Sequence, residues 1–237
     1  LRVTGVQTCA LPISAYWTPA GGTYLLGRCR ATQSNAPDEW DDANGRGPYT
    51  WASHAIAGRN AKGDYFSTAR ISDIAATFAI NGNQTSSVKV HGKLGGHKLA
   101  DPQGVLQNAT YAREFKINSD KLQFNSLIEF GDDKAPGELW ELLPCQIGPD
   151  AAVTKIELSM FGMWSPIDEE PHKTGMIAIT RYGQTITIEL SPARNVQLAP
   201  VTNSRETGGV DVRNIMIDLT PVKHGTTETF YTIRTGR

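Results

Sequence analysis

Side chains along most of this chain alternate between apolar and polar, and this period of two constrains the fold more than any other feature. Leu122, Phe124 and Ile128, for example, fall on one side of such an alternation, and Gln123 and Asn125 fall on the other. Successive side chains of a β-strand point to opposite faces, so this pattern is typical of strands with one buried face. An amphipathic helix would need a period near 3.6, and no segment shows one convincingly.

Segments of this kind recur about every 8–12 residues and end at Gly, Pro, Asn or Asp, which is the rhythm of an antiparallel sandwich or barrel. About a dozen to fourteen strands are expected, including residues 23–30, 75–80, 87–94, 110–117, 122–130, 138–143, 153–161, 175–181, 185–190, 195–198, 212–219 and 228–234. The segment 71–79 comes nearest to an amphipathic helix, although Thr77, Phe78 and Ile80 fit a strand as well. Hairpin turns are predicted at residues 118–120 and 182–184, where Asn, Asp and Gly suit tight turns. The sequence therefore predicts an all-β fold, a large two-sheet antiparallel β-sandwich that is supersandwich-like.

The N-terminal segment does not fit this pattern. Residues 3–13 read VTGVQTCALPI, which resembles the in-frame translation of a common sequencing-library adapter and indicates a gene assembled from a metagenomic sample. We therefore expect residues 1–13 to be an adapter-derived artefact that is excluded from fold reasoning. Residues 14–237 are expected to form a single β-sandwich domain, the C-terminal fragment of a longer protein.

Composition excludes several partners. The formal net charge is −1, and basic residues form no stripe, which argues against nucleic acid. No run of eighteen apolar residues exists, so no membrane-spanning helix is expected. Outside the adapter-like segment the cysteines are Cys29 and Cys145. They are too few for a disulfide framework; two buried thiols or one bridge are both consistent with the sequence.

The order of several motifs resembles a known family. A strand Tyr-Leu-Leu-Gly-Arg at residues 24–28 precedes a polar loop, and Gly-Pro-Tyr-Thr-Trp-Ala-Ser-His follows at 47–54. Ser-Thr-Ala-Arg stands at 67–70, His-Gly at 91–92, and a strand with a Tyr-x-Arg-x-Phe pattern at 109–115 precedes Leu-Gln-Phe at 122–124. This order is similar to the C-terminal β-sandwich of polysaccharide lyases of the heparinase II/III and alginate-lyase types.

The resemblance implies a role in a carbohydrate-active enzyme. In that family a helical toroid carries most catalytic residues, so none is assigned here. The chain would support a missing N-terminal catalytic domain, contact an acidic, uronic-acid-containing polysaccharide, and be secreted or periplasmic. The alternative from another class is a non-catalytic sandwich module for cell-surface adhesion or assembly. A third hypothesis is an isolated enzyme with His54 and Arg113 in one cleft.

Arg113 is the most informative single residue. By alternation it shares a face with Tyr111 and Phe115, and an arginine on an apolar face is costly unless it is paired. Glu138 or Glu141 could supply the carboxylate. A structural ion pair inside the sandwich, an arginine that lines a groove for an acidic sugar, and an exposed arginine all remain open.

The remaining substrate-binding candidates are His54, Tyr49, Trp51 and Trp40. Aromatic rings stack on sugars, and histidine titrates near neutral pH and can move a proton. Alternation places Tyr49 and Trp51 on one strand face and His54 on the other, so a strand with buried aromatics and a hydrogen-bonded histidine also fits. The acidic run around Trp40 fits a solvated loop.

No cofactor and no metal are expected. His91, His97 and Asp101 are too poorly spaced for a convincing zinc site, which needs three or four converging ligands. The glycines at 92, 95 and 96 do not form a phosphate-binding pattern.

Overall fold

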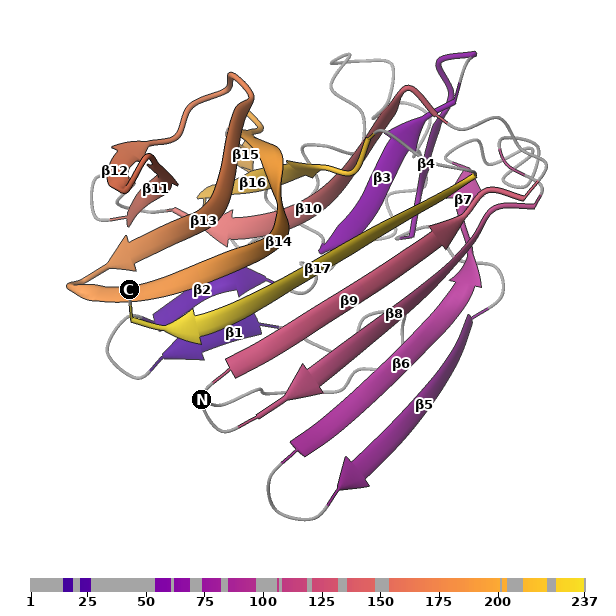
Figure 1. The fold of residues 1–237 in the computed structure, drawn as a ribbon, viewed down its shortest axis with the longest axis horizontal. Helices are drawn as coiled ribbons and strands as arrows, with labels where there is room; N and C mark the ends of the chain where they lie inside the picture. The colour runs from indigo at the N-terminus through magenta and orange to yellow at the C-terminus, as the bar shows by residue number, and fades with distance from the viewer. Residues whose placement is uncertain are drawn as a thin grey trace.

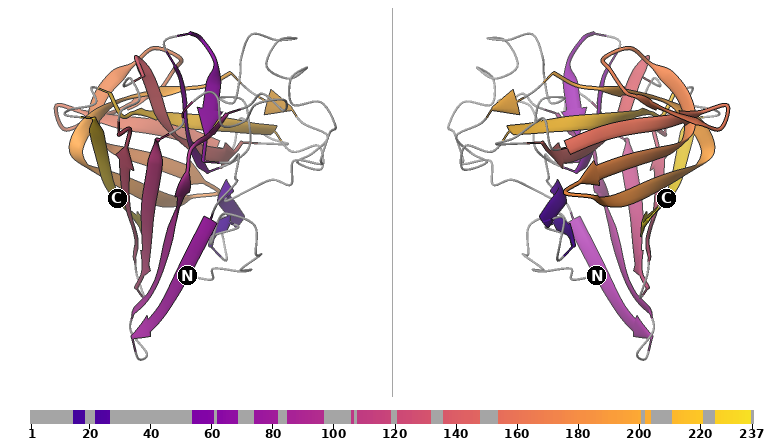
Figure 2. Two further views of the ribbon diagram at one scale, coloured as in Figure 1. Left: turned by 90° about the vertical axis from the view of Figure 1, so that its right-hand side faces the viewer. Right: turned by 90° about the vertical axis from the view of Figure 1, so that its left-hand side faces the viewer.

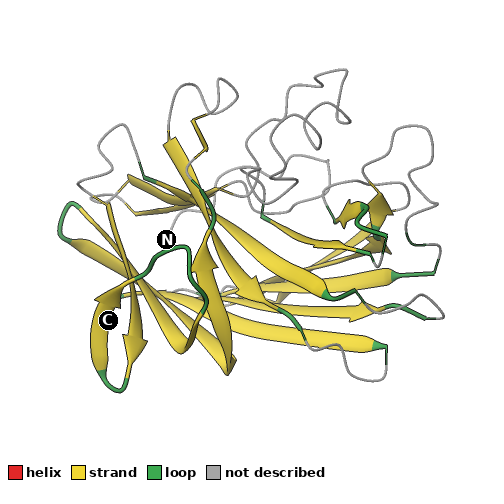
Figure 3. Cartoon of the chain, turned by 90° about the horizontal axis from the view of Figure 1, so that it is seen from above, coloured by secondary structure: helices red, strands yellow, loops and turns green. Residues whose placement is uncertain are grey.

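The computed structural model describes residues 15–18, 22–26, 54–60, 62–68, 74–81, 85–96, 106, 108–118, 121–131, 136–147, 154–200, 202–203, 211–220 and 225–236. Every regular element among them is a β-strand (Figure 3), which confirms the all-β class. The first nine strands are β1 (Ala15–Thr18), β2 (Gly22–Leu26), β3 (Ala55–Arg59), β4 (Tyr65–Ser67), β5 (Ile74–Asn81), β6 (Thr85–Lys93), β7 (Gly95–Gly96), β8 (Thr110–Ile117) and β9 (Lys121–Glu129). The others are β10 (Glu138–Gln146), β11 (Thr154–Met160), β12 (Met163–Pro166), β13 (His172–Arg181), β14 (Gln184–Leu198), β15 (Thr202–Asn203), β16 (Asp211–Asp218) and β17 (Thr226–Thr235). The described part of the chain contains no helix capable of crossing a membrane.

The described strands belong to one curled antiparallel sheet with two arms. The first arm runs in the order β5, β6, β8, β9, β17, β14, β13, β11 and β12 (Figure 1). The second arm joins β14 to β16, β10 and β3, with β2 and β4 at its borders. Antiparallel pairing is as predicted, but the hydrogen bonds connect both arms into a single sheet.

The long strand β14 makes this connection. Residues 186–191 pair with β17, whereas Val196–Leu198 pair with β16. Pairing with β13 shifts register between Thr174 and Met176, opposite the point where β14 changes partners. One strand therefore serves both arms, and the sheet curls so that the arms face one another, as the side views in Figure 2 show.

Several local predictions can be compared with the described residues. Within the ambiguous segment 71–79, the described residues 74–79 belong to the strand β5. The predicted hairpins are confirmed: the Asn118 N–H donates to the Lys121 carbonyl at 2.9 Å, and Tyr182 and Gly183 both have positive φ angles, 47° and 74°, in the turn between β13 and β14. The two strands predicted at 185–190 and 195–198 are one continuous strand.

The inner faces of the two arms enclose the core. Strand β9 buries alternate residues, including Leu122, Phe124 and Ile128, as its sequence predicts. From the other arm, Leu139 and Leu143 of β10 are fully buried in the same apolar cluster. Burial of apolar surface contributes about 25 cal/mol per Å², so this shared interior is the main force that holds the curl closed.

The close approach of β3 to its neighbours requires a glycine. A Cβ atom at Gly58 would clash with the Glu138 carbonyl oxygen and lie 2.7 Å from Cζ of Phe66. We expect Gly58→Ala to lower the free energy of unfolding by about 1–3 kcal/mol, the usual cost of overpacking. Gly137→Ala is the matched control, because no heavy atom lies within 4 Å of a Cβ there. Urea denaturation checks this; equal effects of the two variants would contradict it.

Candidate functional site

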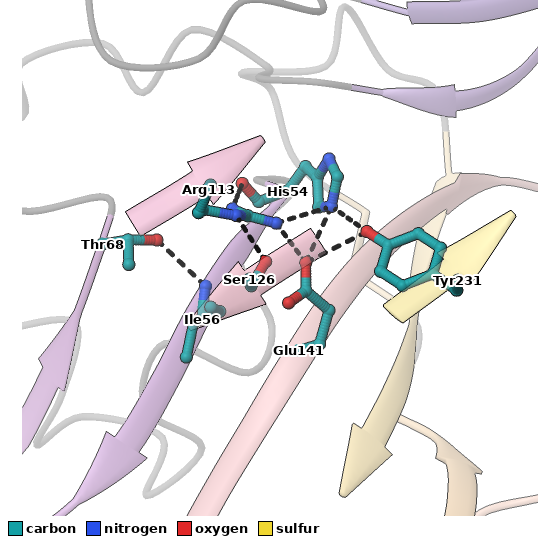
Figure 4. Close-up of polar contacts among 7 residues, drawn as sticks. All are labelled: His54, Ile56, Thr68, Arg113, Ser126, Glu141 and Tyr231. Atoms are coloured by element: carbon teal, nitrogen blue, oxygen red, sulfur yellow. Dashed lines mark hydrogen bonds and ion pairs between the residues drawn. The ribbon is translucent and has the colours of Figure 1, made fainter. Parts of the chain in front are cut away.

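Five polar residues meet in the interior between the two arms (Figure 4). We call His54, Arg113, Ser126, Glu141 and Tyr231 the buried ionic cluster. Three of them come from the first arm, on β8, β9 and β17; Glu141 lies on β10 of the second arm, and His54 immediately precedes β3. Strand alternation that turns apolar neighbours inward also turns these polar side chains inward. The cluster therefore links the two arms across the core.

One oxygen of Glu141 is the centre of the cluster. Oε1 of Glu141 is within hydrogen-bonding distance of Nη2 of Arg113, of Nε2 of His54 at 2.9 Å and of the Tyr231 hydroxyl at 3.1 Å. Arg113 also donates from Nε to the Ser126 hydroxyl at 3.2 Å. Arg113 and Ser126 are directly opposite one another on β8 and β9, which explains this contact.

Three polar groups meet at Nε2 of His54, one of them the Tyr231 hydroxyl at 2.6 Å. Nε2 lies 3.0 Å from Nη2 of Arg113, which can only donate, and 2.9 Å from the carboxylate oxygen of Glu141, which can only accept. With Nε2 protonated, His54 donates to Glu141; with Nε2 unprotonated, it accepts from Arg113. Figure 4 draws the other ring nitrogen, Nδ1, pointing away from Arg113 and Glu141. All the polar contacts of the His54 ring with Arg113, Glu141 and Tyr231 are thus made through Nε2.

Burial and charge together set the pKa values. Burial and the positive charge of Arg113 lower the pKa of His54, outweighing the opposing effect of Glu141. Burial alone would raise the pKa of the Glu141 carboxyl, but Arg113 and the hydrogen bond from His54 hold it below its usual range. Burial and the Glu141 charge raise the pKa of Tyr231 well above its usual value. The stable state of the cluster is thus Arg113⁺ with Glu141⁻, neutral His54 and neutral Tyr231.

Aromatic rings surround the cluster and exclude water from it. Phe124 stacks on Tyr231, with ring centroids 4.6 Å apart and planes 13° from parallel, and it meets the His54 ring edge-on at 5.0 Å. The guanidinium of Arg113 lies 5.4 Å from the centre of the Phe115 ring. The His54 side chain is 8% exposed and that of Glu141 is fully buried. In this state a solute does not reach the carboxylate.

The structure confirms some of the site residues predicted from the sequence and does not describe others. Arg113 is buried on the predicted face, and its carboxylate partner is Glu141; Glu138 instead pairs with Arg59 at the surface, at 3.7 Å. His54 and Arg113 do come together, but inside the core and not in an open cleft. Tyr49, Trp51 and Trp40 lie outside the described residues.

Sequence reasoning missed Tyr231 and Ser126. The only signal was weak: Tyr231 stands among Thr227, Thr229 and Ile233 on the inward face of β17, where its hydroxyl needs a partner.

Of the other candidates, Cys145 is buried, and burial raises its pKa to about 12, which makes it an inert thiol. Cys29, His97 and Asp101 lie outside the described residues. Within the described part, no group of three His, Cys, Asp or Glu residues is placed to hold a metal ion.

A second candidate site is open to solvent. A groove with a volume of about 620 Å³ lies where β14 changes partners, beside the end of β16 and the start of β17. We call it the polar groove. It is lined by Lys173, Pro192, Ala193, Arg194, Asn195, Asp218, Thr220, Thr226, Thr227 and Glu228. Its volume falls in the range of small-molecule sites, about 300–1,000 Å³.

Hydrogen bonds hold several lining groups of the polar groove in place. Thr220 donates to Oδ1 of Asp218 from its N–H at 2.8 Å and from its hydroxyl at 2.5 Å. Arg194 donates from Nη2 to the Glu228 carbonyl at 2.7 Å. Nε of Arg194 is buried and has no partner among the described residues. The groove therefore presents fixed donors and acceptors, with two cationic side chains balanced by two anionic ones.

Comparison with known proteins concerns the fold. No protein-family model matches the chain, and no curated protein matches it. A solved structure described as an aldose 1-epimerase from Escherichia coli is 10% identical, with a TM-score of 0.48, and covers 94% of this chain and 92% of that chain. A galactose mutarotase-like protein from Lactobacillus casei is 10% identical, with a TM-score of 0.44 and 90% coverage of each chain.

These neighbours correct the predicted family and function. The solved structures found are described as an aldose 1-epimerase and a galactose mutarotase-like protein, and not as lyase domains. The predicted resemblance to heparinase II/III-type and alginate-lyase-type C-terminal sandwiches is therefore wrong, together with the lyase-supporting or non-catalytic role that followed from it. The motif that suggested a lyase has another explanation: Arg113 in Tyr-x-Arg-x-Phe serves the buried ionic cluster. Strand rhythm is common to many large antiparallel folds.

Breaking the buried charge pair should destabilise the protein strongly. Glu141→Gln leaves the Arg113 charge buried without a counter-charge, which typically costs about 3–5 kcal/mol. Glu138→Gln, on the same strand but in a surface pair, should cost less than about 1 kcal/mol. The double variant Arg113→Met/Glu141→Leu should recover most of the loss. Denaturant unfolding checks all three; similar stabilities for the Glu141 and Glu138 variants would contradict the central role of the pair.

The cluster also predicts a dependence of stability on pH. Because the folded pKa of His54 lies below its ordinary value of about 6.5, the unfolded chain binds more protons as pH falls below that value, and stability decreases. Glu141 adds a further loss at lower pH, since its folded pKa is also lowered. In His54→Gln the amide can still donate to Glu141 but does not titrate. Urea midpoints between pH 7 and pH 5 should therefore fall less in this variant; parallel curves would contradict the assignment.

Proposed function

We propose that this chain is a carbohydrate-binding protein and that it takes a small neutral sugar in the polar groove. The observation that carries the proposal is the chemistry of the lining. Hydroxyl groups of a sugar both donate and accept hydrogen bonds, and the groove offers both kinds of partner: carboxylates, an amide, threonine hydroxyls and two cations. Fixed polar groups in a concave site of this volume are the usual basis of small-molecule recognition.

The balanced charge of the groove favours a neutral sugar over the uronic acid expected from the sequence. The lining contains Lys173 and Arg194 together with Asp218 and Glu228, so no net positive charge of the lining attracts a carboxylate. Arg113, the residue expected to meet an acidic glycan, already has its counter-charge in Glu141 and is 2% exposed. For these two reasons we place the proposed ligand in the polar groove and not in the core.

We also infer how the fold supports this site. In the proposal, the two arms act as the layers of a large antiparallel, supersandwich-like β-sandwich, with the buried ionic cluster between them. The bend of β14, which must pass from one layer to the other, places Arg194 and Asn195 beside the ends of β16 and β17. The groove is thus built on paired strands, which hold side chains more precisely than loops do.

Binding of simple hexoses tests the proposal. At about 0.3 kcal/mol per non-hydrogen atom, a hexose is expected to bind with a dissociation constant on the order of 1 mM. Asn195→Ala and Lys173→Met should each weaken binding about three- to tenfold, the effect of about one lost hydrogen bond. NMR titration with glucose, galactose and mannose measures this. Glucuronate should bind no more tightly than glucose.

The control is Lys89→Met, which removes an exposed lysine from β6, a strand that contributes nothing to the groove. It should leave hexose affinity unchanged. The proposal fails if no hexose shifts resonances of groove residues, or if the control weakens binding as much as Lys173→Met does.

A further inference from the structure

Two apolar side chains lie on the outer face of the sheet beside the polar groove. Phe230 of β17 and Leu127 of β9 are each 37% exposed, although most large apolar residues of these strands are buried. Leu127 pairs with Glu228 and Phe230 pairs with Asn125, so the two are diagonal neighbours on one face. Diagonal partners lie about 7–8 Å apart, within reach of an aromatic ring. We call these two residues the apolar shelf.

The shelf adjoins the groove through two separate strands. On β17, Glu228 and Phe230 are two residues apart and point outward together, and Glu228 lines the groove. On β14, Ser191 pairs with Phe230 and is followed by Pro192, which also lines the groove. Phe230 is therefore a strand neighbour of groove-lining residues on both β17 and β14, and a ligand that extended beyond the groove in this direction would meet it.

The occupant of the shelf follows from its size and surroundings. The two partly exposed side chains offer far less apolar surface area than a stable protein interface needs, since such an interface buries about 800 Å² on each partner. An aromatic ring next to fixed polar groups suits a sugar, because the ring packs on the apolar C–H face while hydroxyls bond at the side. We propose that the apolar shelf is a second subsite and that the ligand is an oligosaccharide of two or more neutral units. This inference rests on the proposed function.

The dependence of affinity on the length of the oligosaccharide tests the second subsite. The ligands to compare with glucose are two series of oligosaccharides: cellobiose and cellotriose, and maltose and maltotriose. The wild-type protein should bind the members of one or both series at least tenfold more tightly than glucose. Phe230→Ala should remove that gain and leave glucose affinity within twofold. Phe230→Tyr, which keeps the ring, should retain the gain. Phe161→Ala is the matched control: Phe161 is a fully exposed phenylalanine in the turn between β11 and β12, and its removal should change neither affinity.

The outcomes separate this inference from the proposed function. If glucose binds in the groove but oligosaccharides bind no more tightly, or if Phe230→Ala keeps the gain, the second subsite is wrong and the groove stands. If neither glucose nor any oligosaccharide binds, both proposals fail. Unfolding midpoints of each variant confirm that affinity is compared between folded proteins.

Discussion

The ion pair between Arg113 and Glu141 is the constraint on which the rest of this structure depends. Removing two charges from water costs several kcal/mol for each ion, and only close contact and further hydrogen bonds offset that cost. His54, Ser126 and Tyr231 supply those bonds, and each belongs to a different segment of the chain. The pair therefore favours one registration of the two arms, because any other would leave a buried charge alone.

The same arrangement limits what the interior can do. His54 has a lowered pKa and lies within hydrogen-bonding distance of a carboxylate, and a neutral imidazole can take up a proton. Yet its side chain is 8% exposed, and the aromatic rings of Phe124 and Tyr231 close the space around it. The interior thus holds the arms together. Our proposal therefore places recognition at the surface, where the bend of β14 brings groups of both charges together.

Alternation made much of the fold predictable. It gave the strand class, the antiparallel hairpins at Asn118 and Tyr182, and the inward direction of Arg113, since side-chain period and turn chemistry are local properties. Alternation predicted only part of the buried ionic cluster. Glu138 and Glu141 were equivalent candidates for the carboxylate partner of Arg113, because they lie three residues apart on one short segment. Only strand pairing decides which of the two faces the core.

What the sequence by itself determined is therefore the set of strands and the face of each strand that is buried. The tertiary structure alone decided that one strand, β14, joins both arms, that Tyr231 meets Glu141 ninety residues away, and that Asn195 and Asp218 line a common groove. The physical reason is that alternation acts between neighbours in the chain. Which strands pair depends instead on the free energy of packing and charge burial summed over the whole molecule.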